Sequence, residues 1–313
     1  MNVRKFKPAI WLYNLFHYRR LLHNKRAYAQ YHLHKPLIAS LSSKDFPDTS
    51  SQAWLDIHDA EIVAQQKKGF YEFPQMLQNE ISGWSRNGFL VLPGFLDTAT
   101  CNSITREIDH LLSTKKIQYA QENKIMFANR CSRLIDQVTQ NPLLKKVLSF
   151  ILDKDVVPFQ TINFIKGSEQ RAHSDSIHMT TYPLGYLIAA WIALEDVDAD
   201  NGPLFYYPGS HKLPYMMNES FNEGENFLRV GKKDYRDYED MIELQIGELG
   251  LKKVELHVKK GDVFVWHANL LHGGSPILDT NRTRKSMVIH YFAKDVIKYH
   301  EITERPSLLE ERH

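Results

Sequence analysis

The chain has 313 residues, which is enough for one large catalytic domain with appendages or for two modest domains. Apolar residues make up 43% of it and charged residues 24%, which is ordinary for a globular protein and excludes global disorder. The net charge of +2 gives no sign of a nucleic-acid partner, and no apolar run reaches the roughly 18 residues that a transmembrane helix needs. Only two cysteines are present and no cleavable signal is recognisable, so we expect a cytoplasmic protein.

The first section of the chain is basic and aromatic. No carboxylate precedes Asp45, whereas the first 44 residues carry nine cations: Arg4, Lys5, Lys7, Arg19, Arg20, Lys25, Arg26, Lys35 and Lys44. Apolar side chains recur at helical spacing between Ala9 and Tyr31, which predicts one or two amphipathic helices. Two interpretations follow. The segment either contacts an anionic membrane surface or an acidic partner, or it packs on the rest of the protein with a solvated basic face. We favour the second.

Helices dominate the next hundred residues. A polar stretch, Leu41–Gln52, reads as a loop, and residues 53–87 read as helical, with Asn87-Gly88 as the stop. The apolar run Phe89–Leu92 suits a short strand. Asp97 or Thr98 is a suitable cap for a helix that continues to about Ser113, and a further helix is expected over Asn141–Leu152. We place a domain boundary near residue 75, between an N-terminal helical extension (1–75) and the main domain (76–313).

From Pro158 onward short β-rich runs replace the helices. They are separated by Gly, Pro, Asn and Asp residues and comprise Phe159–Ile165, Tyr186–Leu194, Leu204–Tyr207, Val254–Val258, Asp262–His267 and Ser286–Phe292. Helices followed by antiparallel-type strands predict an α+β protein whose β part is a sandwich or jelly roll covered on one face by helices. An insertion at about 218–250 is polar and mixed in charge, which suggests a lid or a substrate-facing loop.

A first candidate for metal chemistry is the pair His173-x-Asp175. In an extended segment, side chains at positions i and i+2 point the same way, so one imidazole and one carboxylate can approach the same ion. His272 is a second candidate, because a β-rich run leads to it and two glycines follow it, which permits close approach of the backbone. Two histidines and one carboxylate on different segments, with open positions, are the ligand set of non-haem Fe(II) oxygenases. A structural zinc site would need a fourth ligand, and none is evident.

Two arginines follow His272 closely. A guanidinium can bind a carboxylate through two hydrogen bonds, so either Arg282 or Arg284 is suited to hold the far end of a dicarboxylate. Arg284 lies at the beginning of the strand expected over Ser286–Phe292. His178 and His267 lie close to the candidate ligands in sequence, and a role beside the metal or substrate and a packing role are about equally plausible for each.

These signals, in this order, resemble the phytanoyl-CoA dioxygenase family of Fe(II)/2-oxoglutarate-dependent oxygenases over roughly residues 88–302. The segments that carry the resemblance are Thr161–Asn163 with His173–Asp175, Ala190–Asp196, Asn201–Leu204, Pro208–Lys212, Lys260–Gly273 and Arg284–Phe292. The resemblance implies a double-stranded β-helix (jelly-roll, cupin-like) core. It also implies that His173, Asp175 and His272 bind iron, that Arg284 rather than Arg282 pairs with the 5-carboxylate of 2-oxoglutarate, and that Asn163 and Trp191 line the co-substrate or iron pocket. This chain departs from the common pattern at Ser174 and Gly274, which puts one hydrogen bond to 2-oxoglutarate in doubt.

The activity that the resemblance implies is hydroxylation of a small organic or acyl-type substrate. Fe(II), 2-oxoglutarate and O2 would be required, and 2-oxoglutarate would be decarboxylated to succinate and CO2. Related halogenases lack the carboxylate ligand, so Asp175 indicates hydroxylation. Two alternatives are a non-catalytic member that keeps the fold and binds a ligand, and a cupin-like metalloenzyme without 2-oxoglutarate. Arg284 argues against both.

Overall fold

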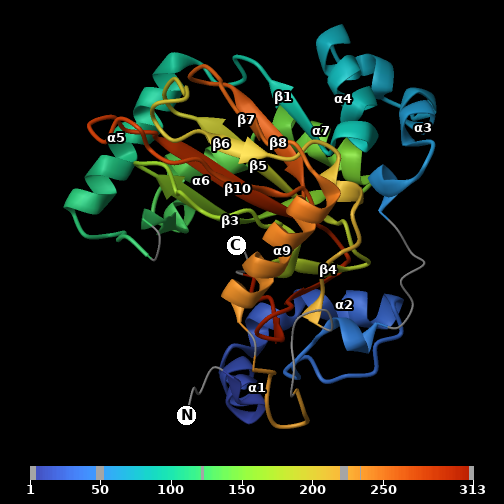
Figure 1. Ribbon diagram of the computed structural model, residues 1–313. Helices are drawn as coiled ribbons and strands as arrows, with labels where there is room; N and C mark the ends of the chain where they lie inside the picture. Colours follow the sequence, from blue (N-terminus) through green and yellow to red (C-terminus); the bar gives the residue numbers. More distant parts are fainter. Residues whose placement is uncertain (1–4, 47–52, 121–122, 219–224, 233, 310–313) are drawn as a thin grey trace.

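A computed structural model describes residues 5–46, 53–120, 123–218, 225–232 and 234–309 (Figure 1). Its helices are α1 (Lys7–Phe16), α2 (His23–Gln30), α3 (Ala60–Gln66), α4 (Gln75–Asn87), α5 (Thr98–Ser113), α6 (Arg133–Thr139), α7 (Pro142–Leu152) and α9 (Tyr235–Leu249). Its strands are β1 (Phe89–Leu92), β2 (Ile125–Met126), β3 (Val156–Phe164), β4 (Thr180–Tyr182), β5 (Leu187–Ala193), β6 (Leu204–Tyr206), β7 (Val254–Glu255), β8 (Val263–His267), β9 (His272–Gly274), β10 (Ser286–Ala293), β11 (Ile297–His300) and β12 (Arg305–Pro306). Among the described residues, no helix is long and apolar enough to cross a membrane.

The centre of the molecule is an antiparallel sheet with strand order β1-β8-β5-β10-β3-β2. One face of this sheet packs against α3 to α7, and the core between them includes Ile104, Leu148 and Ile289. Alternate residues of a strand face opposite sides of a sheet, so Val288 and His290 lie on the other face of β10. The helices therefore seal one side of the sheet and leave the other for the site.

A smaller antiparallel sheet, β7-β6-β9, covers that second face. Apolar side chains from both sheets meet between them, including Trp191 and Phe264 from the large sheet and Leu204 from the small one. The expectation of an α+β protein with an antiparallel two-sheet core, covered by helices on one face, is thereby confirmed.

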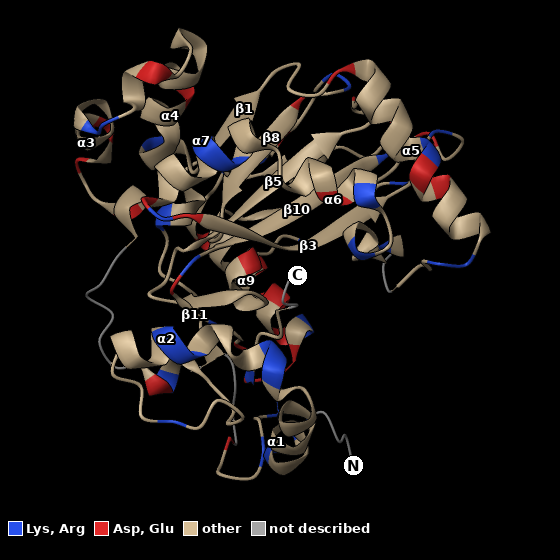
Figure 2. Ribbon diagram, turned by 180° about the vertical axis from the view of Figure 1, so that it is seen from behind, with Lys and Arg blue, Asp and Glu red and all other residues tan. Residues whose placement is uncertain are grey.

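A third sheet, β12-β11-β4, connects the core to the N-terminal helices. Ala27 and Tyr28 of α2 pack with Ile297 and Tyr299 of β11, and Phe46 stacks on Tyr182 at a centroid distance of 4.3 Å. Figure 2 shows the blue cationic segments of this N-terminal part at the lower end of the molecule, away from the large sheet. The domain boundary near residue 75 stays a prediction, although Leu55 and Phe70 belong to the main core.

Most elements expected from the sequence form with small shifts at their ends. The helices after Ala9, Asp97 and Asn141 and all six β-rich runs are present. The region 53–87 contains two helices, α3 and α4, separated by a turn at Gly69, where φ is +91°. The loop expected over 41–52 falls partly outside the described residues, because 47–52 are not described.

The insertion needs a correction, because residues 235–249 form helix α9 rather than a loop. Asp234 and Asp237 form a reciprocal cap at its N-terminus, and Gly250 ends it with φ at +60°. Tyr238 and Ile242, four residues apart, are the buried side of this helix and pack against Leu271. The polar composition obscured this narrow apolar stripe, which is what attaches the helix to the site.

Candidate metal centre and active site

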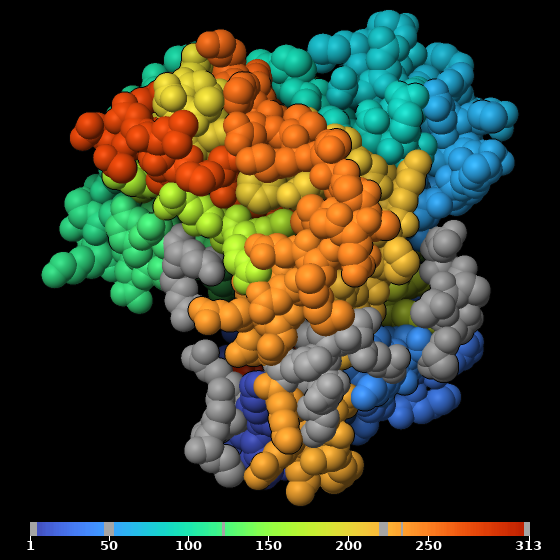
Figure 3. Space-filling view, viewed as in Figure 1, coloured from blue at the N-terminus to red at the C-terminus, as the bar shows by residue number. Residues whose placement is uncertain are grey.

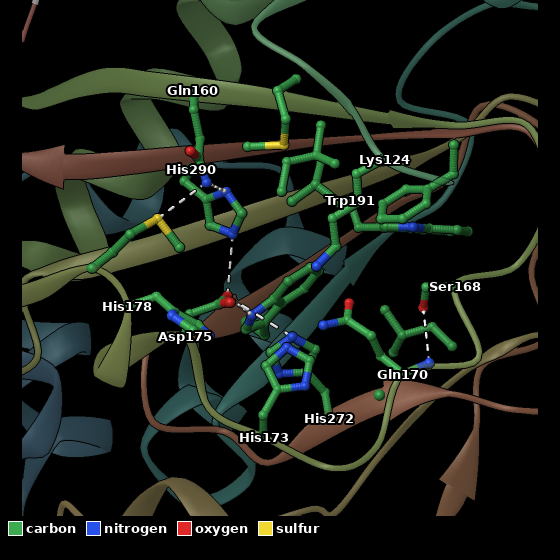
Figure 4. A pocket seen from close by; sticks show the side chains of 18 of the residues that line it. Lys124, Gln160, Ser168, Gln170, His173, Asp175, His178, Trp191, His272 and His290 are labelled. Atoms are coloured by element: carbon green, nitrogen blue, oxygen red, sulfur yellow. Dashed lines mark hydrogen bonds and ion pairs between the residues drawn. The ribbon is translucent and has the colours of Figure 1, made fainter. Parts of the chain in front are cut away.

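The three predicted metal ligands come together between the two sheets. His173 and His272 form an antiparallel bridge, and each backbone N–H donates to the carbonyl of the other at 2.9 Å. This bridge brings the imidazoles side by side, with a centroid distance of 4.5 Å. Asp175 follows two residues after His173 and points to the same place, so one ligand atom from each residue lies within 4.8 Å of the others (Figure 4).

Both histidines are oriented by the same local contact. The Nδ1 atom of His173 lies 2.9 Å from the carbonyl of Arg171, and the Nδ1 atom of His272 lies 2.9 Å from that of Leu270. A carbonyl oxygen accepts only, so each Nδ1 carries the proton and each Nε2 keeps its lone pair. Burial lowers the pKa of both imidazoles, that of His173 to about 3, which keeps them neutral as metal ligation requires.

The carboxylate of Asp175 is held by two donors from the large sheet. Trp266 Nε1 donates to Asp175 Oδ2 at 2.8 Å, and His290 Nε2 lies 3.2 Å from the same oxygen. Burial alone would favour the protonated acid, but the neighbouring His290 and His272 hold the pKa of Asp175 well below its usual range. Because both contacts use one oxygen, the other carboxylate oxygen remains for a metal ion.

This arrangement meets the chemical requirements of a divalent iron site. Two neutral imidazoles and one ionised carboxylate converge from two segments, and no further His, Cys, Asp or Glu joins the group within the described part of the chain. Three protein ligands leave positions for a co-substrate and O2, whereas a structural zinc site would occupy all four. The residues present therefore fit Fe(II).

Arg284 provides a buried positive charge in the same cavity. Its side chain is only 2% exposed, and its guanidinium lies over the rings of Phe164 and Trp191 at 5.5 and 5.6 Å. It donates hydrogen bonds to neutral groups, from Nε to the carbonyl of Gly202 at 3.1 Å and from Nη1 to Ser286 Oγ at 2.8 Å. Burial lowers its pKa to about 10, and no carboxylate forms a salt bridge with it among the described residues. A buried cation of this kind requires an anion.

Arg282 is placed quite differently. Its Nη1 and Nη2 atoms each donate to a carboxylate oxygen of Asp198 at 2.8 Å, and the pair lies at the surface. The choice of Arg284 over Arg282 as the candidate carboxylate-binding residue therefore agrees with where each side chain lies.

The cavity that contains the three ligands and Arg284 measures about 350 Å³. Its apolar walls include Met126, Phe159, Met179 and Val288. Besides the three ligands and Arg284, its polar lining residues include Lys124, Gln160, His178 and His300. A small cavity that combines apolar walls with convergent polar groups is typical of a site that orients a small molecule.

Of the two further predicted pocket residues, one lies in the cavity and one does not. Trp191 lines it from β5. Asn163 needs a correction, because its neighbours Ile162 and Phe164 line the cavity and Asn163 lies on the opposite face of β3, paired with Met287 of the helix-covered side. Strand alternation decides this, and the sequence does not show which of the two faces meets the cavity.

The two histidines whose roles the sequence left open, His178 and His267, lie in different environments. His178 lines the cavity, where its Nδ1 lies 3.4 Å from Nε2 of His300. His267 lies outside the cavity, with Nε2 2.8 Å from Asp56 Oδ1 and Nδ1 accepting from the backbone N–H of Asn269. His267 thus lies outside the cavity, whereas His178 is one of its lining residues.

Glycines make room for this site. A Cβ atom on Gly273 would lie 2.5 Å from the ring of Phe205, and one on Gly274 would lie 2.5 Å from Ser168 Oγ. Ser168 lines the cavity, so its hydroxyl stands next to the place where a side chain at residue 274 would point. The departure at Gly274 is therefore matched by a hydroxyl from another segment.

Several residues of the site escaped the sequence-based prediction: Lys124, Gln160, Ser168, Trp266, His290 and His300. His290 had a usable signal, since it lies two residues from Val288 on a strand that begins beside Arg284. Trp266 had one as well, because it is the polar-tipped aromatic residue in an otherwise apolar strand. The others depend on contacts between distant segments.

Helix α9 supports the segment that carries two of the ligands. Tyr238 Oη lies 3.0 Å from both the backbone nitrogen and the hydroxyl of Ser174, the residue between His173 and Asp175. Arg171 joins Asp240 and Glu243 of the same helix at 2.7 and 2.6 Å. The insertion therefore braces the metal-ligand segment from outside.

Comparison with known proteins is consistent with this geometry. A model of the family described as Phytanoyl-CoA dioxygenase (PhyH) matches residues 84–286. Peroxisomal phytanoyl-CoA dioxygenase of Rattus norvegicus is 30% identical over 135 residues, which cover 42% of this chain and 35% of the rat protein. The Homo sapiens protein of the same name is 21% identical over 287 residues, covering 83% of this chain and 76% of the human one. The first two relatives, from rat and Bos taurus, are matched over only 35% and 64% of their own length.

Solved structures share the fold at low sequence identity. The non-heme alpha ketoglutarate dependent carbocyclase SnoK has a TM-score of 0.62 at 15% identity, with 78% of this chain and 96% of SnoK covered. EctD from S. alaskensis with 2-oxoglutarate and 5-hydroxyectoine has a TM-score of 0.55 at 19% identity, with 74% and 82% covered. The match of the family model over most of the chain shows that this protein belongs to the phytanoyl-CoA dioxygenase family of Fe(II)- and 2-oxoglutarate-dependent oxygenases.

Proposed function

We propose that this protein is an Fe(II)- and 2-oxoglutarate-dependent dioxygenase that hydroxylates a small organic or acyl-type substrate. The observation that carries the proposal is one cavity holding both the His173, Asp175 and His272 group and a buried Arg284 without a carboxylate partner in the described part of the chain. A ligand that binds a metal at one end and presents a carboxylate at the other satisfies both, and 2-oxoglutarate is such a ligand.

Each group then has a definite task. His173, Asp175 and His272 would hold Fe(II), and Arg284 would hold the distal carboxylate, with Phe164 and Trp191 keeping water from the guanidinium. Bound Fe(II) and 2-oxoglutarate supply the activation of O2 that is coupled to release of succinate and CO2. Trp266 and His290 fix the carboxylate of Asp175, so the protein orients the reactants rather than supplying a nucleophile.

The size and lining of the cavity favour a compact reacting group. About 350 Å³ lies at the lower end of the usual range for ligand sites, and 2-oxoglutarate would fill part of it. Phe159 and Met179 offer apolar contact, while Gln160 Nε2 lies 3.2 Å from Nδ1 of His290, and His178 and His300 add polar groups. We therefore propose a substrate whose reacting carbon lies on an aliphatic portion, with a polar group nearby.

The test is Fe(II)-dependent conversion of 2-oxoglutarate to succinate, measured with and without candidate substrates. His173→Ala is expected to abolish turnover, because it removes a ligand. Arg284→Ala is expected to raise KM for 2-oxoglutarate by roughly a hundredfold. The distal carboxylate would lose a charge-assisted bidentate contact and be buried without a partner. Arg282→Ala is the matched control, and its exposed pair with Asp198 predicts a change of less than about fivefold.

The outcomes separate the alternatives. A wild-type protein that binds 2-oxoglutarate but releases no succinate with Fe(II) and candidate substrates would favour a non-catalytic ligand-binding member. Metal-dependent oxidation that does not need 2-oxoglutarate would favour a cupin-like enzyme. Equal effects of Arg284→Ala and Arg282→Ala on KM would overturn the assignment of Arg284.

A further inference from the structure

Helix α1 buries two polar side chains and exposes an apolar face, the reverse of what an amphipathic helix packed on a protein usually shows. Its buried face carries Lys7, Ile10 and Asn14, spaced three and four residues apart. Its opposite face exposes Leu12 and Phe16, also four residues apart, and the Phe16 side chain is 79% exposed. An amphipathic helix normally buries its apolar stripe. Here two polar side chains face inward and the apolar side faces out.

Specific contacts hold α1 in this orientation. Lys7 Nζ lies 2.9 Å from a carboxylate oxygen of Glu225 and 2.8 Å from one of Glu304, and Lys7 is almost completely buried. Asn14 Nδ2 donates to the carbonyl of Ile38 at 2.9 Å. Rotating the helix to cover Leu12 and Phe16 would remove Lys7 from the buried carboxylate of Glu304 and break one of the two ion pairs of Glu225, which is unfavourable. The exposed apolar face is therefore built into the fold.

A second segment extends this face. Phe6 forms a β-bridge with Arg229, Lys7 N donates to the carbonyl of Leu228 at 2.9 Å, and the ring of Trp11 meets Phe227 edge-on at 5.7 Å. Phe227 is 76% exposed and Leu228 is exposed as well. In the space-filling view, the blue of α1 and the orange of residues 225–232 adjoin at the lower end of the molecule (Figure 3).

We call this surface the N-terminal apolar patch, and its members are Leu12, Tyr13, Leu15, Phe16, Phe227 and Leu228. Exposed cations accompany it. Arg19 follows α1, and Arg229 follows Phe227 and Leu228 in the chain. Lys232 lies near Lys5, whose Nζ donates a hydrogen bond to the backbone carbonyl of Lys232. Arg19, Arg229 and Lys232 form no ion pair among the described residues.

Two acids of this region are paired within the protein. Glu225 pairs with Lys7 and with Lys44, at 2.9 and 2.6 Å. Asp45, the first carboxylate of the chain, pairs with Lys35 at 2.7 Å. Glu225 and Asp45 are thus paired internally, whereas Arg19, Arg229 and Lys232 are exposed cations without an ion pair among the described residues, which favours an anionic partner.

We propose that the N-terminal apolar patch docks the protein on an anionic lipid membrane surface. Leucine and aromatic side chains on one face, with cations at the edge, are the features of helices that lie in the interface of a bilayer and respond to acidic lipids. This proposal is independent of the proposed function. From the sequence we favoured packing of the N-terminal segment over membrane contact; α1 does pack on the protein, but through its polar side, which leaves the apolar side free.

The test is co-sedimentation of the full-length protein with vesicles. One set contains phosphatidylcholine only, and the other contains roughly 30% phosphatidylserine. We expect binding to the anionic vesicles that weakens as salt is raised. The double variant Leu12→Gln/Phe16→Gln is expected to lower the partition coefficient at least about tenfold, and Arg229→Glu to lower it roughly fivefold.

Matched variants control for general changes in surface character. Leu244→Gln/Leu278→Gln removes two similarly exposed leucines elsewhere, and Lys116→Glu reverses an exposed charge after α5. Both are expected to bind like wild type. Melting temperature and succinate production report folding and should be unchanged in all four variants.

Three results would overturn the proposal: wild-type protein that stays in the supernatant with anionic vesicles at low salt, equal binding to both lipid mixtures, or a Leu12→Gln/Phe16→Gln variant that binds like wild type. Size-exclusion chromatography adds a fourth. A dimer that Leu12→Gln/Phe16→Gln converts to monomer would assign the patch to a second copy of the chain instead.

Discussion

The contact between Trp266 and Asp175 leads to a sharp prediction about metal affinity. Trp266→Phe keeps an aromatic ring beside His272, which lies 4.7 Å away between ring centroids, but removes the indole N–H that donates to Asp175 Oδ2 at 2.8 Å. His290 remains as a donor to the same oxygen. The variant therefore isolates one hydrogen bond that orients a candidate ligand without touching the ligand itself.

The expected magnitude follows from the charge of the acceptor. A hydrogen bond to a charged group contributes about 1.5–3 kcal/mol. Because His290 still contacts the carboxylate, we expect the lower end of that range, which corresponds to roughly tenfold weaker binding of the metal. The melting temperature of the metal-free protein should also fall, because Trp266 is buried and the smaller ring leaves a cavity and one hydrogen bond fewer to the buried carboxylate.

Anaerobic calorimetric titration with Fe(II), and with Co(II) as an oxygen-stable substitute, measures this affinity directly. Trp84→Phe is the matched control, because Trp84 is equally buried but belongs to the helix-covered core and its indole nitrogen has no partner among the described residues. It should lower the melting temperature without changing metal affinity. Wild-type affinity in Trp266→Phe would refute the idea that this hydrogen bond positions Asp175.

Three further predictions concern packing and pH. Gly274→Ser should weaken 2-oxoglutarate binding, because the new Cβ would lie 2.5 Å from Ser168 Oγ and the two would overlap. Adding Ser168→Gly removes this overlap and should restore binding. A calorimetric titration in which the second change restores nothing would contradict this explanation. Gly88→Ala should lower the melting temperature by several degrees, because φ is +77° and the added Cβ would overlap the His211 ring. An unchanged melting curve would be the contrary result. Burial lowers the pKa of His23 to about 3, so this imidazole stays neutral in the folded protein, whereas in the unfolded chain it takes up a proton below about pH 6.5. The free energy of unfolding therefore falls as the pH drops. From pH 7.5 to pH 5.5 this proton uptake lowers the free energy of unfolding by about 1.3 kcal/mol. In denaturant titrations His23→Gln should lose less stability over this pH range than the wild type, and equal losses would disprove the role of His23.

Much of the architecture is readable in the sequence, because local signals dominate it. The caps at Asp97 and Asn141 and the stop at Gly88 mark helix ends through short-range hydrogen bonds and backbone conformation. Runs of alternating or apolar residues mark the strands. Helices α6 and α9 and several short strands, among them β4 and β11, were not predicted. In α9 the two buried residues are surrounded by charges.

The candidate metal ligands are also visible in the sequence, since a two-residue spacing and a histidine before two glycines are local patterns. Their convergence depends on the bridge between His173 and His272, whose residues lie far apart in the chain. The donors to Asp175, Trp266 and His290, come from β8 and β10, so only the sheet order brings them to one carboxylate.

The sequence by itself determined most of the longer helices and strands, the set of candidate ligands and the resemblance to the family, because these are encoded in short-range spacing and in recurring motifs. The tertiary structure alone decided which side of each element matters. It placed Trp191 in the cavity and Asn163 outside it, buried Arg284 while leaving Arg282 at the surface, and turned the apolar side of α1 outward. Periodicity shows that an element has two faces, but only contacts between distant segments, such as the pairing of Lys7 with Glu304, select the face that is buried.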